Sequence, residues 1–72
     1  MNILLVEDNE SIADGLKFNF EKNGYKLDYC LKIKDAKEYL KNHKPNLIIL
    51  DLTLPDGNGF ELYESVIKEK NI

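Results

Sequence analysis

The chain has 72 residues, with ten lysines and no arginine against thirteen acidic side chains, for a net charge of −3. That length allows one small domain at most, and the acidic balance excludes a nucleic-acid-binding surface within these residues. A single cysteine excludes an internal disulfide and a cysteine-rich metal site. Apolar runs of at most four residues exclude a membrane span. No secretory signal is visible at the start, so we expect a cytoplasmic protein.

The first third of the chain predicts a strand followed by a helix. Residues 2–6 form a short apolar run, which is typical of a buried parallel strand. Asn9 is a good N-cap for a helix over about residues 10–23, and Gly24 suits the left-handed conformation just beyond its end. The apolar stripe expected on this helix consists of Ile12, Ala13, Leu16 and Phe20.

A second strand and helix are predicted in the middle of the chain. Residues 25–30 alternate between apolar and polar side chains, which favours an edge strand with one solvated face. Residues 34–42 predict a short helix with Ala36 and Leu40 facing inward, and Pro45 prevents its continuation.

The last third predicts a third strand, a loop and a third helix. Residues 47–51 read as a strand that is apolar on both faces. Two glycine-containing pairs, Asp56-Gly57 and Asn58-Gly59, resemble hairpin turns, but we expect them to shape the loop that enters the helix. The side chains expected on or near one face of this helix are Phe60, Tyr63, Val66 and Ile67.

Acidic side chains follow two of the three predicted strands. Glu7 and Asp8 end the first strand, and Asp51 ends the third. If these strands are parallel neighbours, the three carboxylates meet at the sheet edge where α/β proteins bind ligands. Carboxylates held together repel one another unless a cation or proton joins them. The pattern therefore indicates a divalent metal and chemistry on an anion.

Three segments in this order resemble the receiver domain of two-component response regulators (CheY-like): residues 3–8, residues 47–51 and residues 54–59. The resemblance covers the whole chain and implies an α/β, flavodoxin-like fold with three layers. The expected pattern is βαβαβα with parallel strand order 2-1-3. The family's domain continues for two more strands and two more helices, so we expect residues 1–72 to be its N-terminal part.

The resemblance also implies roles for the acidic residues. Asp51 would accept a phosphoryl group from a histidine kinase. Asp8 and Asp51 would bind Mg²⁺ directly, Glu7 would bind it through water, and the backbone carbonyl of Thr53 would be a further ligand. A Ser or Thr on a fourth strand and a Lys on a fifth normally complete the site, and both would lie beyond Ile72. We therefore expect residues 1–72 alone to accept a phosphoryl group slowly or not at all. The family is a signalling domain rather than an enzyme, and its Leu-Pro-Asp-Gly loop suggests transcription control through a separate DNA-binding domain.

Other interpretations remain open at this point. Glu7 and Asp8 could simply be acidic residues before a helix, where negative charge is favourable. The chain could be an interaction or dimerisation module that is never phosphorylated. An aspartate-nucleophile phosphohydrolase of the haloacid-dehalogenase type is disfavoured, because it needs Asp where Thr53 stands. We also expect the 72 residues to self-associate through the edge of strand 47–51, either by symmetric pairing or by segment exchange.

Overall fold

The computed structural model describes residues 1–51 and 53–70. Its main sheet has three parallel strands in the order β2-β1-β3, as predicted: β1 spans Asn2–Val6, β2 spans Lys26–Cys30 and β3 spans Leu47–Leu50. Two strands form a separate antiparallel hairpin, β4 at Thr53–Leu54 and β5 at Gly57–Asn58. The helical segments are α1 at Glu10–Lys22, α2 at Ile33–Asn42, α3 at Gly59–Leu62, the π-helical turn η1 at Tyr63–Ile67, and α4 at Lys68–Lys70.

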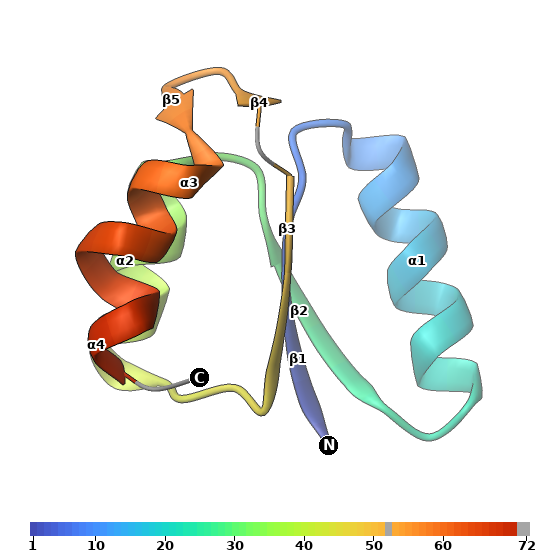
Figure 1. Cartoon of the computed structure of the whole chain (residues 1–72). Coiled ribbons are helices and arrows are strands. Elements are labelled where there is room, and N and C mark those ends of the chain that lie inside the picture. The colour runs from blue at the N-terminus through green and yellow to red at the C-terminus, as the bar shows by residue number, and fades with distance from the viewer. Residues whose placement is uncertain (52, 71–72) are drawn as a thin grey trace.

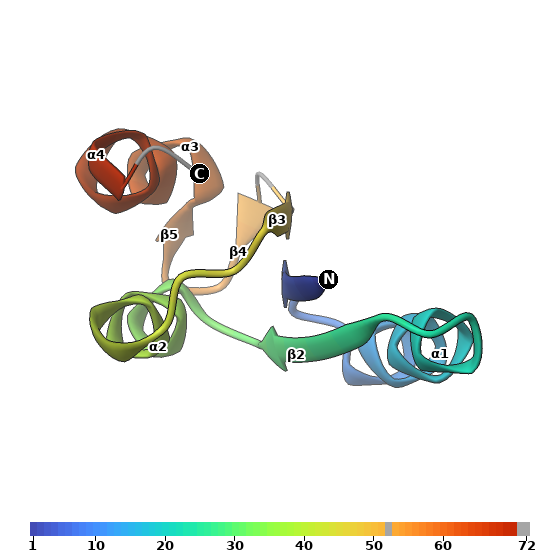
Figure 2. The ribbon, with the colours of Figure 1, turned by 90° about the horizontal axis from the view of Figure 1, so that it is seen from below.

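The helices cover both faces of the sheet. Figures 1 and 2 show α1 on one face, and α2 with the continuous segment α3–η1–α4 on the other. This is the three-layer α/β arrangement expected from the sequence, with β1 in the centre and β2 and β3 beside it. Within residues 1–51 and 53–70, no helix is long and apolar enough to cross a membrane.

The central strand explains why the fold needs helices on both faces. Ile3 and Leu5 contribute to the cluster under α1, while Leu4 and Val6 contribute to the cluster under α2 and α3. All four side chains are at most 2% exposed. Such complete burial on two faces is the property that distinguishes a parallel strand from a half-solvated antiparallel one.

Local signals place α1 much as predicted. The Asn9 side chain accepts the backbone N–H of Ile12 at 3.1 Å, which is the expected N-cap. The chain leaves the helix at Gly24 with φ of +91°, a conformation that glycine adopts readily. One part of the stripe is wrong: Ile12 is 50% exposed, whereas Ala13 is fully buried.

The prediction for β2 is correct in its position and wrong about its solvation. The strand lies at the edge of the sheet, but its second face is covered because α2 packs there. The Tyr39 hydroxyl of α2 donates to the Asp28 carboxylate at 2.9 Å, and Cys30 packs against the core under this helix. Asp28 and Cys30 are therefore half-buried rather than solvated.

The predicted inner face of the third helix also needs correction. Leu62 is fully buried and Ile67 is 4% exposed, whereas Phe60 and Tyr63 are 56% and 41% exposed. Gly59 and Leu62 are buried and Val66 is half-buried, and these residues stand at i, i+3 and i+7, the spacing of one face of an ordinary helix. The prediction placed this face one residue too late, at Phe60 and Tyr63 instead of Gly59 and Leu62.

Candidate functional site

The carboxyl ends of β1 and β3 are held level by backbone hydrogen bonds. Val6 and Leu50 are register partners, and the Asp51 N–H donates to the Val6 carbonyl at 3.0 Å. On the other side of β1, the Glu7 N–H donates to the Cys30 carbonyl at 3.0 Å. The parallel ladder thus extends one residue past the strands and fixes where the two acidic ends lie.

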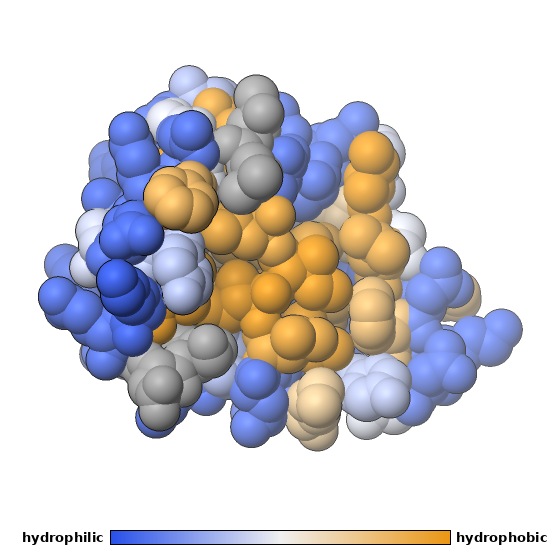
Figure 3. All heavy atoms as spheres, viewed as in Figure 1, coloured by the Kyte–Doolittle hydropathy of each residue, from blue (hydrophilic) through white to orange (hydrophobic). Residues whose placement is uncertain are grey.

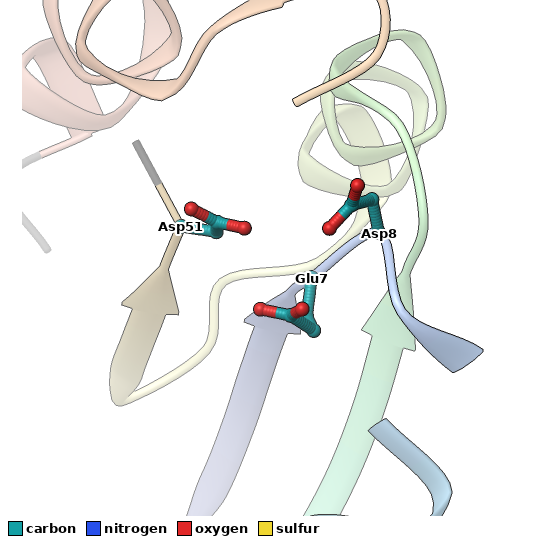
Figure 4. A group of neighbouring side chains, drawn as sticks. All are labelled: Glu7, Asp8 and Asp51. Atoms are coloured by element: carbon teal, nitrogen blue, oxygen red, sulfur yellow. The ribbon is translucent and has the colours of Figure 1, made fainter. Parts of the chain in front are cut away.

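Three carboxylates converge at this edge, as the sequence predicts. Each of Glu7, Asp8 and Asp51 offers an oxygen, and these oxygens lie within 4.8 Å of one another. Figure 4 shows the three side chains pointing into one shared space between the ends of β1 and β3. Glu7 and Asp51 are half-buried and Asp8 is exposed, so a ligand can reach the group from solvent.

This donor set suits a hard divalent cation. Mg²⁺ prefers oxygen ligands and is usually held by one or two carboxylates, with water and substrate phosphate oxygens completing its shell. A cation would also offset the repulsion among three like charges at this spacing. The residues present therefore fit the predicted metal.

Glu7 has a second role at the start of α1. Its side-chain oxygen accepts the Asn9 backbone N–H at 3.3 Å, just before the helix begins. Because the N-cap itself is Asn9, this contact at the start of the helix accounts for part of the role of Glu7. A role at the start of α1 does not explain why the Glu7 and Asp8 carboxylates lie close to that of Asp51.

The segment after β3 forms a small hairpin, contrary to the prediction. Thr53 pairs with Asn58 and Leu54 with Gly57, so that Pro55 and Asp56 make the turn. The predicted entry into the helix also occurs, because the Asn58 side chain accepts the Phe60 N–H at 2.8 Å and caps α3. Thr53 therefore begins a strand, and its role as a carbonyl ligand stays a prediction. Leu52 lies outside the described residues.

Sequence reasoning missed the role of Asp56. Its two carboxylate oxygens accept the N–H groups of Ile33 at 2.8 Å and Lys34 at 3.0 Å, which caps α2 from the hairpin. These two N–H donors, Lys34 first, lower the pKa of the Asp56 carboxyl below its ordinary value. A signal was available: the N-cap position of α2 is occupied by Lys32, whose side chain has no acceptor for the helix N–H groups.

Two tyrosine side chains, Tyr29 and Tyr39, form hydrogen bonds between the sheet and the helices on its two faces. Tyr29 of β2 donates to Asp14 of α1 at 2.6 Å, and this bond raises the pKa of Tyr29 to about 12. Burial, with a smaller contribution from the bond to Asp28, raises the pKa of Tyr39 to about 12. Burial likewise raises the pKa of the Cys30 thiol to about 11, as expected for a cysteine that packs against the core.

Comparison with known proteins identifies relatives over most of the chain. The family model for the response regulator receiver domain matches residues 3–72. The virulence transcriptional regulatory protein PhoP of Salmonella typhimurium LT2 is 37% identical over 62 residues, which cover 86% of this chain and 28% of that protein. The transcriptional regulatory protein PhoP of Escherichia coli O6:H1 is 39% identical over the same shares. The chain thus spans about 28% of the length of these curated relatives.

Solved structures of receiver domains also match this chain. A CheY-like receiver domain from Methanospirillum hungatei matches with a TM-score of 0.91 at 31% identity, covering 97% of this chain and 56% of that one. The non-phosphorylated HemR receiver domain of Leptospira biflexa matches with a TM-score of 0.82 at 40% identity over the same shares. TrrA of Thermotoga maritima, solved in complex with Mg²⁺ and BeF, matches with a TM-score of 0.88 at 28% identity, covering 97% and 61%. With the acidic edge, the strand order and these matches together, the chain belongs to the response regulator receiver domain family.

Proposed function

We propose that this chain is the phosphoacceptor part of a two-component response regulator, in which Asp51 accepts a phosphoryl group from a histidine kinase with Mg²⁺ present. The observation that carries the proposal is the convergence of Glu7, Asp8 and Asp51, whose carboxylate oxygens lie within 4.8 Å of one another at the open edge of the sheet. Membership of the receiver family supports the same function.

Each acidic residue has a distinct place in this proposal. Asp8 and Asp51 would hold the metal directly, Glu7 would hold it through water, and the Thr53 carbonyl would add a ligand. When bound, Mg²⁺ neutralises negative charge on the group being transferred. Glu7 is further held by the Asn9 N–H, which orients its carboxylate before any metal arrives.

Phosphoryl transfer requires a nucleophilic, negatively charged oxygen that is held in a fixed position. A carboxylate oxygen of Asp51 would attack the phosphorus atom of a phosphohistidine, forming a P–O bond as the P–N bond breaks. The imidazole nitrogen would leave with the bonding electron pair, and Asp51 would become an acyl phosphate. The hydrogen bond from the Asp51 N–H to Val6 anchors the backbone of the nucleophile during this exchange.

The consequence in the cell is proposed from the relatives. Both PhoP proteins are described as transcriptional regulators, and this chain matches 28% of their length. We propose that the phosphorylated receiver controls transcription in the cytoplasm through a DNA-binding domain outside these 72 residues. Under this proposal the domain acts as a signalling partner of a sensor kinase and is not itself an enzyme.

Phosphoramidate with Mg²⁺ tests the proposal directly. In a protein that carries the complete receiver domain, intact mass spectrometry should show the addition of one phosphoryl group, and borohydride reduction should convert the modified Asp51 to homoserine. Asp51→Asn should abolish the adduct, while Asp35→Asn, which removes an exposed carboxylate from α2, should leave it unchanged. Equal labelling of Asp51→Asn and the wild type would show that Asp51 is not the acceptor.

One surface favours the alternative of an interaction module. Figure 3 shows a continuous apolar area in the middle of one face of the molecule, on the side of β3 in the view of Figure 1. A groove of about 230 Å³ there is lined by Asn46, Leu47, Ile48, Leu50, Tyr63 and Ile67. A chain that associates through this surface without any labelling of Asp51 would fit the alternative, whereas labelling at Asp51 fits the phosphoacceptor.

A further inference from the structure

The first turn of α2 depends on a residue from another part of the chain. At its N-cap, Lys32 provides no side-chain cap within the described structure, although the first N–H groups of a helix need acceptors. Asp56 supplies them, with Oδ1 bound to the Ile33 N–H at 2.8 Å and Oδ2 to the Lys34 N–H at 3.0 Å. We call this pair of hydrogen bonds the cross-loop cap.

A close packing contact accompanies the cross-loop cap. Gly57 follows Asp56 with φ of +151°, and a Cβ built on it would lie 2.9 Å from the Cδ1 atom of Ile33. Ile33 itself is only 6% exposed, and it shares a core cluster with Leu54 of β4. The hairpin is therefore seated on the first turn of α2 by both polar and apolar contacts.

The same hairpin lies close in sequence to the acidic edge. Asp51 precedes β4, and its N–H is bonded to Val6 of β1. Glu7 is bonded through its N–H to Cys30, which ends β2 shortly before α2 begins. Hydrogen bonds and short chain segments thus close a ring that runs from Asp51 through β1, β2 and α2 to Asp56. Within that ring, the cross-loop cap joins the hairpin to α2, as the bond from the Tyr39 hydroxyl to Asp28 joins α2 to β2.

We infer that Asp56 is a positioning residue for the acidic site, because it fastens the segment carrying Asp51 and Thr53 to α2 and so holds Asp51 opposite Glu7 and Asp8. This inference rests on the proposed function for its relevance to phosphoryl transfer. The inference concerns the position of Asp51, however, and can be tested without measuring phosphoryl transfer. Groups behind the ligands of a metal commonly control its affinity by fixing ligand positions.

The competing explanation is that Asp56 only stabilises α2. A double variant separates the two explanations, because Lys32→Ser gives α2 a cap of its own. In Lys32→Ser/Asp56→Ala, the helix is capped locally but the hairpin is no longer fastened to it. Lys32→Ser alone and Asp35→Ala, which removes an exposed charge from the first turn of α2, serve as matched controls.

Two NMR measurements on the full chain give the readouts. Amide hydrogen exchange without metal reports the Asp51 N–H bond to Val6, and a Mg²⁺ titration reports the affinity of the acidic site. In the double variant we expect α2 amides to keep wild-type protection, the Asp51 amide to exchange faster, and the Mg²⁺ dissociation constant to rise roughly tenfold, the lower end of the effect of removing a supporting partner. Both controls should match the wild type at Asp51.

The exchange measurement decides the inference whatever the metal does. Wild-type exchange at Asp51 in the double variant would overturn it and leave Asp56 as a simple helix cap. If the wild-type chain shows no Mg²⁺ response at all, the proposed function loses its metal site, while faster exchange at Asp51 would still support the positioning role.

Discussion

The backbone N–H of Asp51 donates to the carbonyl of Val6 at 3.0 Å, so the residue after β3 is fastened to the last residue of β1. Glu7 and Asp8 directly follow that carbonyl in sequence. The main-chain ladder consequently contributes to the approach of the acidic residues, and their side chains can be changed without removing this bond. Substitutions at the three carboxylates should therefore report on ligand binding more than on folding.

We predict weak Mg²⁺ binding at the acidic edge. Titration followed by NMR should shift the amides near Glu7, Asp8 and Asp51, where the carboxylates converge. Glu7→Gln, which changes a ligand expected to act through water, should weaken binding by roughly 10- to 100-fold. Asp8→Asn should weaken it at least as much, since it replaces a direct ligand. Shifts confined to other parts of the chain would contradict this site.

The strands of the sheet could be predicted because they follow from short-range patterns. Apolar runs identify β1 and β3, and helical crossovers require these strands to be parallel. The central place of β1, which brings Asp51 beside Glu7, was expected from the family resemblance. Asn9 and Gly24 identify the ends of α1 through conformations that depend on one residue each. The two ends of α1 need no knowledge of a distant contact.

Two of the features that were missed depend on contacts between distant segments. The bond from Ile33 to Asp56 joins residues far apart in sequence, and the local sequence shows only that Lys32 cannot cap α2, not which residue does so. Tyr39 covers Asp28 only because α2 folds back over β2, which turns a strand face that looks solvated into a half-buried one. Leu62 was missed for a different reason: the prediction put the larger Phe60 on the inner face, whereas its small neighbour Gly59 lies there, in line with Leu62.

The corrected face of the third helix leads to a stability prediction. Leu62→Ala should lower the free energy of unfolding by about 2–5 kcal/mol, because Leu62 is fully buried and its removal leaves a cavity. Phe60→Ala should change it by about 0.5 kcal/mol or less, since Phe60 is 56% exposed. Urea denaturation followed by circular dichroism measures both. A larger loss from Phe60→Ala than from Leu62→Ala would restore the face expected from the sequence.

The cross-loop cap should make stability depend on acid pH. The pKa of Asp56 is lowered in the folded protein by the N–H groups of Lys34 and Ile33, whereas an unfolded Asp titrates near about 3.9. A group with a lowered folded pKa stabilises the fold fully above its unfolded pKa, and this contribution disappears as pH falls through the folded value. The stability difference between wild type and Asp56→Asn should thus be constant at neutral pH and shrink below about pH 5. Denaturation of both proteins across this range measures it, and a difference that does not change with pH would argue against an ionised cap.

The final prediction concerns the 72 residues expressed alone. Among residues 1–51 and 53–70, β3 is hydrogen-bonded to β1 on one side, and its other edge pairs with no strand. Leu47 on this strand is 43% exposed, and the neighbouring groove is largely apolar. A bare apolar edge is a template for pairing with another chain. We therefore expect a dimer at high micromolar concentration, with two copies of β3 paired antiparallel about a two-fold axis or with a segment exchanged.

Leu47→Lys should shift sedimentation toward monomer, because a lysine on an edge strand opposes pairing. Phe18→Lys is the matched control, since Phe18 is 67% exposed on α1, and it should leave the dimer intact. A folded wild-type monomer with slowly exchanging β3 amides would falsify the prediction.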